Sequence, residues 1–151
     1  MKENLNDYIK HREWFRPFAV AVPEEDCARY FECSELCQSM NSLARVKPGV
    51  DVLPDGFVLP GNLVHLQVVQ QQGNTLLWRL LKRFGEQAPA PLLVNTSFNL
   101  FGEPLVVKAR DAVRSYFCSG IDALVIDNFV LSKTPAKIAP ASGALTKAAL
   151  T

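Results

Sequence analysis

The chain has 151 residues with a formal net charge of +1; 48% of its residues are hydrophobic and 21% are charged. This composition is typical of a globular domain, and it excludes disordered, collagen-like and coiled-coil chains. The near-neutral charge gives no general attraction to nucleic acid or to an anionic membrane, and no apolar run reaches the roughly 20 residues that span a bilayer.

The first seven residues contain no apolar segment of the kind found in signal peptides. We therefore expect a cytoplasmic protein that binds neither nucleic acid nor membrane. In that compartment the four cysteines are expected to be reduced thiols: Cys27, Cys33, Cys37 and Cys118.

The first half of the chain predicts two strands and a helix. An apolar run over 18–22 predicts a buried strand that Pro23 closes. The acidic residues after Pro23 favour a helix start, with Cys27, Tyr30 and Phe31 on one face. A weaker strand is expected over 41–46, and the three prolines and two glycines of 47–60 predict a loop.

The second half alternates strands and helices. Over 63–69, Val64, Leu66 and Val68 are predicted on one face of a strand, opposite His65 and Gln67. Asn74 is a good N-cap for a helix that Gly85 can end, with an apolar stripe of Leu76, Leu77, Leu80, Leu81 and Phe84. A buried strand over 91–94, a helix over 111–119 and a last strand over 123–131 follow.

These elements predict an α/β or α+β fold with a mixed sheet. We expect one domain over residues 1–133. The tail over 134–151 is rich in Ala, Pro, Thr and Ser and has no acidic residue, which is typical of a flexible extension.

Polar residues follow the strand predicted at 91–94. Asn95, Ser97 and Asn99 alternate onto one side of an extended backbone, with Thr96 between them. Amides and a hydroxyl at the mouth of a sheet can bind phosphate or carbonyl oxygens. The alternative is a polar strand end that caps its own turn.

Three cations lie among aromatic residues near the N-terminus. Lys10 and Arg12 fall on one side of an extended chain, and Arg16 precedes a proline. Together they predict a pocket for a polyanion such as a nucleotide phosphate. The alternative is a solvated charged face, with Glu13 and Asp7 nearby. The aromatic neighbours are Trp14, Phe15 and Phe18.

Both segments resemble signatures of one enzyme family. They read Lys10-x-Arg12-Glu13-x-Phe15-Arg16-Pro17-Phe18-Ala19 and Asn95-Thr96-Ser97-Phe98-Asn99-x-x-Gly102-Glu103-Pro104-Leu105-Val106. The chain is similar to the C-terminal domain of the O-carbamoyltransferases that act on nodulation factors and antibiotics. The similarity runs from about Asn6 to Lys133 and includes the last strand, Gly120-Ile121-Asp122-Ala123-Leu124-Val125-Ile126.

The resemblance implies a YrdC-like domain, a twisted open mixed sheet with flanking helices, that converts carbamoyl phosphate and ATP into carbamoyl adenylate. Lys10 and Arg12 match the family's Lys-x-Arg pair, and Ser97 and Asn99 match its Ser-x-Asn motif. With Arg16, these form the expected catalytic set; Asn95 and Thr96 are expected beside the nucleotide. Mg²⁺ is expected with ATP, but no acidic cluster predicts a protein-built metal site. The partner implied is an actin-like domain or subunit that carbamoylates the acceptor.

The chain departs from the family's pattern at several positions. Gly61, Gln67 and Val69 agree with it, but Pro60 stands where the family has aspartate and His65 where it has arginine. Histidine lacks the permanent charge and the bidentate fork of arginine. Arg16, His65 and Gln67 are candidates for substrate binding. Two alternatives therefore stay open: a catalytically degenerate module that binds a nucleotide or a partner, and a related acyl or phosphate chemistry remodelled around His65.

Overall fold

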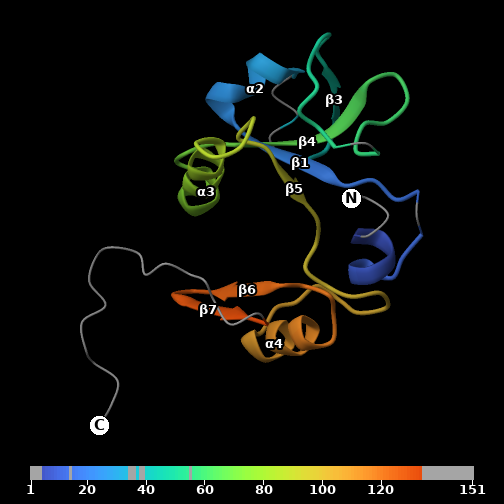
Figure 1. Ribbon diagram of the computed structural model, residues 1–151, viewed down its shortest axis with the longest axis vertical. Coiled ribbons are helices and arrows are strands. Elements are labelled where there is room, and N and C mark those ends of the chain that lie inside the picture. Colours follow the sequence, from blue (N-terminus) through green and yellow to red (C-terminus); the bar gives the residue numbers. More distant parts are fainter. Residues whose placement is uncertain (1–4, 14, 34–36, 38–39, 55, 134–151) are drawn as a thin grey trace. The chain divides into compact units, whose positions relative to one another are not determined.

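The computed structural model describes residues 5–13, 15–33, 37, 40–54 and 56–133. The chain forms two compact units, Met1–Val106 and Val107–Thr151, each with its own sheet and helix (Figure 1). The tail predicted over 134–151 lies outside the described residues, as does Trp14. No helix in the described part of the chain is long and apolar enough to cross a membrane.

The larger unit contains a five-stranded mixed sheet in the order β2-β3-β4-β1-β5. Strands β1 and β4 are parallel, and the other neighbours are antiparallel. The predicted α/β class with a mixed sheet is confirmed. The strands are β1 (Ala19–Pro23), β2 (Phe31–Glu32), β3 (Leu43–Val46), β4 (Leu63–Val69) and β5 (Leu93–Asn95), and the helices are η1 (Leu5–Lys10), α2 (Glu24–Tyr30) and α3 (Thr75–Gly85).

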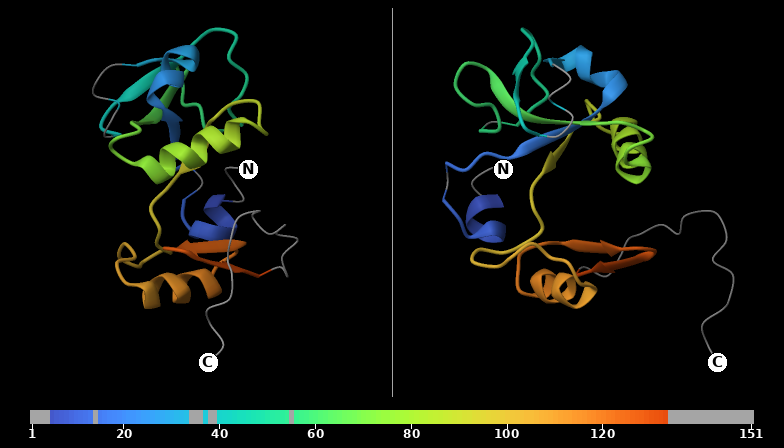
Figure 2. Two further views of the ribbon diagram at one scale, coloured as in Figure 1. Left: turned by 90° about the vertical axis from the view of Figure 1, so that its left-hand side faces the viewer. Right: turned by 180° about the vertical axis from the view of Figure 1, so that it is seen from behind.

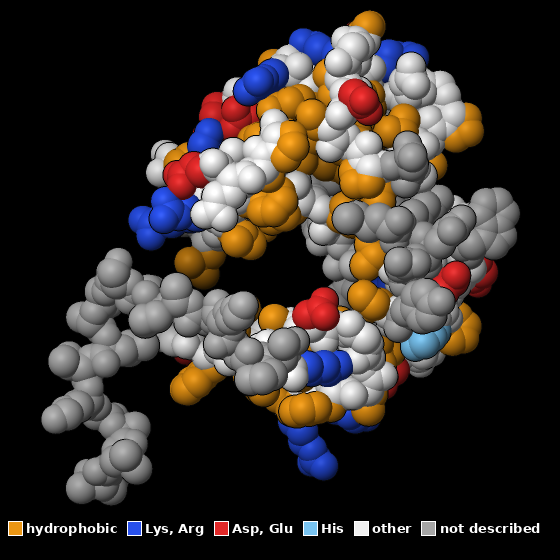
Figure 3. Space-filling view, viewed as in Figure 1, with side chains coloured by type: hydrophobic (Ala, Val, Ile, Leu, Met, Phe, Trp, Pro, Cys, Tyr) orange, Lys and Arg blue, Asp and Glu red, His pale blue; other side chains and the backbone are white. Residues whose placement is uncertain are grey.

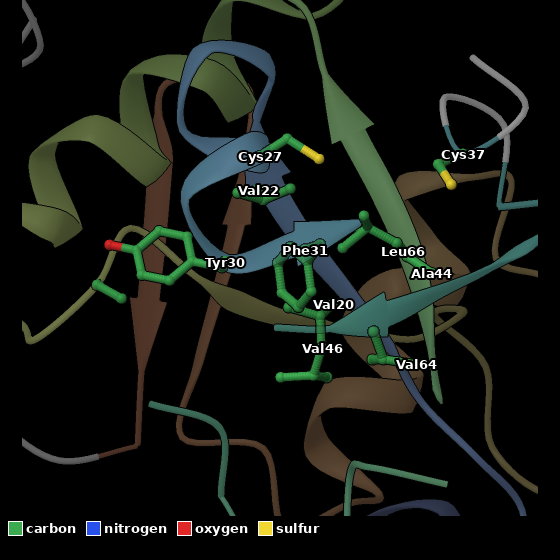
Figure 4. Packing of buried hydrophobic residues seen from close by; sticks show 11 residues of the cluster. Val20, Val22, Cys27, Tyr30, Phe31, Cys37, Ala44, Val46, Val64 and Leu66 are labelled. Atoms are coloured by element: carbon green, nitrogen blue, oxygen red, sulfur yellow. The ribbon is translucent and has the colours of Figure 1, made fainter. Parts of the chain in front are cut away.

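Residues that alternate along β1 face opposite sides of the sheet. Val20 and Val22 pack into the main core with Phe31, Val64 and Leu66 and with Cys27 and Tyr30 of α2 (Figure 4). Ala21 faces the other way and packs against Val69 of β4 and against Leu81 of α3. Helices α2 and α3 therefore cover opposite faces of the sheet (Figure 2).

The predicted face of β4 is confirmed. Val64 and Leu66 are fully buried, whereas His65 and Gln67 are half-buried on the other face, which α3 partly covers. Phe31 differs from the prediction: it begins β2 and is buried there instead of extending the face of α2. The strand at 91–94 is β5, which is only half-buried because it lies at the edge of the sheet.

Helix α3 begins as predicted, since the side chain of Asn74 accepts a hydrogen bond from the Leu77 backbone N–H at 3.1 Å. Its apolar stripe is only partly buried. Leu81 is inaccessible and Leu77 packs beside it, but Leu76, Leu80 and Phe84 are exposed. Figure 3 shows hydrophobic side chains at the surface in this region. The stripe is wider than the sheet face that receives it.

The smaller unit holds α4 (Ala109–Phe117) and a hairpin of β6 (Ala123–Ile126) and β7 (Phe129–Ser132). The single strand predicted over 123–131 is therefore wrong. The chain turns at Asp127, whose φ is +50°, and Asp and Asn tolerate that left-handed conformation. The spacing of the apolar residues in α4 predicts that Ala112, Val113, Tyr116 and Phe117 face inward. Ala112 and Tyr116 are buried, but Phe117 is exposed.

Two of the cysteines also differ from the prediction. Cys27 and Cys33, six residues apart, form a disulfide, because the turn from α2 into β2 brings them together. Cys37 and Cys118 are not part of a disulfide: Cys37 is buried, with its Sγ 3.3 Å from Ser42 Oγ, and Cys118 is exposed.

Candidate functional site

The N-terminal cations are brought together by a turn, not by an extended strand. Lys10 is the last residue of η1, and His11 has a φ of +48°. The chain therefore reverses between Lys10 and Arg12. The backbone N–H of Arg12 then donates to the Asn6 carbonyl at 3.0 Å, which closes the turn.

Lys10 reaches across to the polar segment after β5. Its Nζ donates to the carbonyls of Ser97 and Asn99, both at 2.6 Å, and to Asn99 Oδ1 at 3.2 Å. An ammonium has three donors, so all are used within the chain. Burial, together with the charges of Arg12 and Arg16, lowers the pKa of Lys10. Lys10 thus fixes this segment and contributes charge, while its donors are already occupied.

The Ser97 and Asn99 side chains are bound to each other. Ser97 Oγ donates to Asn99 Oδ1 at 2.6 Å, and Asn99 Nδ2 donates to the Glu103 carbonyl at 2.9 Å. This favours the reading in which the segment caps its own turn, but it also fixes both side chains against Lys10. The two sequence-based readings of this segment are therefore compatible.

All five expected catalytic residues line a small cationic cavity of about 150 Å³. Burial and the charge of Arg16 lower the pKa of Arg12. No carboxylate belongs to the described lining; outside it, Glu13 Oε2 lies 3.9 Å from Arg16 Nη1 and offsets part of the positive charge. Such a site favours an anion that supplies the missing charge. The lining comprises Lys10, Arg12, Arg16, Ser97, Asn99, Leu100, Phe101 and Gly102.

A larger, mainly apolar cavity of about 500 Å³ shares Arg12 and Ser97 with the cationic cavity. Its floor is built by strand register: Ala19 of β1 lies opposite both His65 of β4 and Asn95 of β5. The small Ala19 side chain leaves room above the sheet between these two polar neighbours. Its other lining residues are Pro17, Phe18, Met40, Thr96 and Leu105.

Gln67 is not among the lining residues. It accepts a hydrogen bond from Asn95 Nδ2 at 2.7 Å, and so acts on the cavity through Asn95. Because β5 is antiparallel to β1, its carboxyl end lies beside the amino ends of β1 and β4. The cavity is therefore not at the carboxyl ends of the parallel strands, where open sheets usually bind ligands.

Sequence comparison identifies the family. The sequence model of the protein family "Carbamoyltransferase C-terminus" matches residues 1–133 of the chain. The chain belongs to this family. It is 31% identical to nodulation protein NolO of Bradyrhizobium diazoefficiens over 91% of the chain and 26% of NolO. It is 30% identical to a 3'-hydroxymethylcephem-O-carbamoyltransferase of Amycolatopsis lactamdurans, over 83% of the chain and 24% of that enzyme.

This carbamoyltransferase C-terminal chain spans about a quarter of the curated relatives it matches; for nodulation protein NolNO of Sinorhizobium fredii the share is 20%, at 32% identity. The relatives are therefore larger proteins of which this chain corresponds to one part.

Sequence reasoning missed Asn6, Met40 and Leu105. Asn6 lies four residues before Lys10, a spacing that would place both on one helical face, but no helix was predicted there. Met40 carries no sequence signal. Leu105 belongs to the family motif, but its apolar side chain does not mark it as a lining residue; the tertiary fold brings both to the larger cavity. Among the described residues, no group of three or more His, Cys, Asp or Glu side chains could hold a metal ion.

Proposed function

We propose that this chain forms carbamoyl adenylate from carbamoyl phosphate and ATP, as the adenylating part of a carbamoyltransferase. The observation that carries the proposal is the convergence of Lys10, Arg12, Arg16, Ser97 and Asn99 on one cationic cavity in a member of this family. Cations held in a partly buried cavity pay a desolvation cost that a bound polyphosphate would relieve.

The two cavities suit the two parts of the nucleotide step. A volume of about 500 Å³ lies within the usual range for small-molecule sites, about 300–1,000 Å³. In the proposal the cationic cavity takes phosphate groups, and the larger cavity takes the less charged part of the substrates. Arg12 and Ser97, which line both cavities, lie at the point of contact.

The proposed reaction is substitution at phosphorus. Water releases phosphate from carbamoyl phosphate and leaves carbamate; a carbamate oxygen then attacks the α-phosphorus of ATP, and pyrophosphate leaves. A protein promotes such a step mainly by positioning and by stabilising charge. Arg12 and Arg16 supply guanidinium donors, whereas Lys10 supplies charge and holds Ser97 and Asn99 in place.

Mg²⁺ accompanies ATP in this proposal and would neutralise part of its phosphate charge. The described lining of the cationic cavity has no carboxylate, and the carbonyl oxygens of Ser97 and Asn99 already accept hydrogen bonds from Lys10 Nζ. The residues therefore fit a metal that is brought by the nucleotide better than one that the protein holds by itself.

The acceptor would be carbamoylated by another domain or subunit, for which the actin-like partner is the candidate. This is supported by the length of the relatives, since the match covers only 20–26% of each of them. Removal of the adenylate by that partner would allow turnover.

Pyrophosphate release from Mg-ATP, with carbamoyl phosphate and the transferase partner present, tests the proposal. Arg12→Ala is expected to lower the rate about ten- to a hundredfold, because a hydrogen bond to a charged group contributes about 1.5–3 kcal/mol. Arg79→Ala is the matched control, since it removes an exposed arginine of α3 outside both cavities. Release at background level in the wild type, or equal rates in the two variants, would contradict the proposal.

A second candidate, a catalytically degenerate nucleotide-binding module, is favoured by His65. This residue lines the larger cavity at the position where the family has arginine. The variant His65→Arg separates the candidates. Under the degenerate reading, wild type and variant both bind ATP without releasing pyrophosphate; turnover in either protein would exclude that reading.

A further inference from the structure

Asn6 is a fully buried polar side chain just outside the two cavities. Its exposed fraction is 0%, although it lies in a short polar segment at the start of the described chain. Burial of an amide is costly unless its polar atoms are hydrogen-bonded. Its contacts therefore indicate what the burial accomplishes.

Asn6 is hydrogen-bonded to both Arg12 and Arg16. Asn6 Oδ1 accepts from Arg12 Nε at 2.8 Å, and Asn6 Nδ2 donates to the Arg16 carbonyl at 3.4 Å. The Asn6 carbonyl also accepts from the Arg12 backbone N–H at 3.0 Å. One residue thus holds both the side chain and the backbone of Arg12 and the backbone of Arg16.

The guanidinium of Arg12 is fixed from three directions. Besides the bond to Asn6, its Nη2 donates to the Pro17 carbonyl at 3.5 Å, and its carbon lies 4.5 Å from the centroid of the Phe18 ring. Within the described structure no bond occupies Nη1, which leaves its donors for a ligand in the cavities that Arg12 lines. A guanidinium held in this way loses less rotamer freedom when an anion binds.

We propose that Asn6 is a positioning residue that orients the Arg12 guanidinium for anion binding. This inference rests on the proposed function, because it assumes that the cationic cavity binds phosphate groups. In this proposal Asn6 does not touch the substrate. It acts through the side chain and backbone of Arg12, and its contact with Arg16 is limited to the backbone carbonyl.

A double-mutant cycle tests the coupling, with inorganic pyrophosphate as the calorimetric probe. Asn6→Leu keeps the approximate volume but removes the acceptor, and it should weaken pyrophosphate binding about tenfold. Arg12→Lys should weaken it similarly, since lysine has no Nε for Asn6 to hold. In the Arg12→Lys background, Asn6→Leu should cost less than about twofold, because its effect passes through Arg12. Additive losses in the double variant would overturn the inference, since a general structural defect adds to any other loss.

The outcomes separate this inference from the proposed function. If Arg12→Lys weakens binding and Asn6→Leu does not, the cavity binds anions but Asn6 does not position Arg12. If the wild type binds no pyrophosphate, the proposed function fails instead.

Hydrogen exchange of the Arg12 Nε–H in the unliganded wild type tests the contact without any ligand, and it decides the matter if Asn6→Leu does not fold. The signal is assigned by its absence in Arg12→Lys. It should exchange at least about tenfold more slowly than the Nε–H of the exposed Arg79. Equal exchange rates would overturn the inference.

Discussion

At the scale of single residues, Lys10 shows that a motif match does not reveal which donors of a side chain are already occupied. The motif predicts a cation that binds phosphate directly, but the three donors of Lys10 all bind the segment at Ser97 and Asn99. Its charge still acts on the cavity that it lines. Motif matching therefore located the residue, whereas the hydrogen-bond geometry indicates what it does.

The lowered pKa of Lys10 predicts how ATP binding depends on pH. Burial and then the neighbouring arginines lower this pKa below 10.5, so the ammonium loses its proton at a lower pH in the folded protein. Bound phosphate favours the protonated form. The affinity for ATP should therefore fall as the pH rises through this pKa, and Lys10→Met should flatten the change.

Calorimetric titrations of ATP from neutral pH up to the ordinary lysine pKa of about 10.4 measure this effect. An affinity that stays constant in the wild type over this range would contradict it. The contribution of Lys10 to folding stability changes with pH in the opposite direction to the affinity for ATP. Between the lowered pKa and the ordinary value the unfolded chain binds more protons, so the Lys10 contribution to stability increases with pH.

Histidine and glutamine on β4 show how far strand periodicity extends. The alternation over 63–69 predicts correctly that His65 and Gln67 share a face. It cannot tell that His65 lines the larger cavity whereas Gln67 accepts a hydrogen bond from Asn95, because that difference depends on how β5 is aligned with β4 across the intervening strand β1.

At the scale of elements, α3 shows why an apolar stripe overestimates burial. The helical period groups five apolar residues, but the sheet receives only the side that carries Leu77 and Leu81. Periodicity gives the direction of a face, whereas the width of the contact depends on the surface opposite. The same limit explains Phe117 of α4, which the pattern predicts inside and the structure exposes.

This asymmetry predicts a difference in stability along α3. Leu81→Ala should lower the free energy of unfolding by about 2–5 kcal/mol, because it leaves a cavity at a fully buried position. Leu76→Ala is the matched control, since Leu76 is 80% exposed and should change stability by no more than about 0.5 kcal/mol. Urea unfolding measures both, and equal losses would contradict the assigned orientation of α3.

Gly85 illustrates a correct boundary predicted for the wrong reason. The sequence suggests a left-handed helix stop, but Gly85 is the last residue of α3 and has no positive φ. Its role is close approach: a Cβ built there would lie 2.8 Å from the Pro91 Cβ and 3.1 Å from its Cα. The backbone before β5 passes too close for a side chain.

Gly85→Ala should therefore lower the thermal unfolding midpoint, because the Pro91 backbone must shift. Gly73→Ala is the control: its Cβ would meet atoms of Gln70 at 3.7 Å and 3.8 Å, which is ordinary contact. It should be neutral or slightly stabilising. A midpoint for Gly85→Ala at or above that of Gly73→Ala would exclude the close approach.

At the scale of the whole molecule, family membership and length together show that the chain corresponds to one part of larger relatives. The chain belongs to the carbamoyltransferase C-terminus family and corresponds to 20–26% of the relatives described above. The motifs predicted the family and the residues of the cationic cavity from sequence, because they are contiguous. The division into two units and the hairpin at Asp127 could not be predicted, because tertiary contacts and one turn determine them.

The account also separates two steps that the larger relatives would combine. In the proposed reaction, adenylate formation uses the two cavities, and every residue described as lining them lies in the unit Met1–Val106. Acceptor carbamoylation is assigned to a partner. The first step should therefore be measurable without an acceptor.

Exchange of labelled pyrophosphate into ATP, with the chain alone, tests the central claim most directly. Exchange reports reversible attack at the α-phosphorus, so it requires neither an acceptor nor release of the adenylate. We predict exchange that depends on carbamoyl phosphate, falls about ten- to a hundredfold in Arg12→Ala and is unchanged in Arg79→Ala. If the folded chain binds ATP and carbamoyl phosphate yet shows no exchange above background, it does not form carbamoyl adenylate.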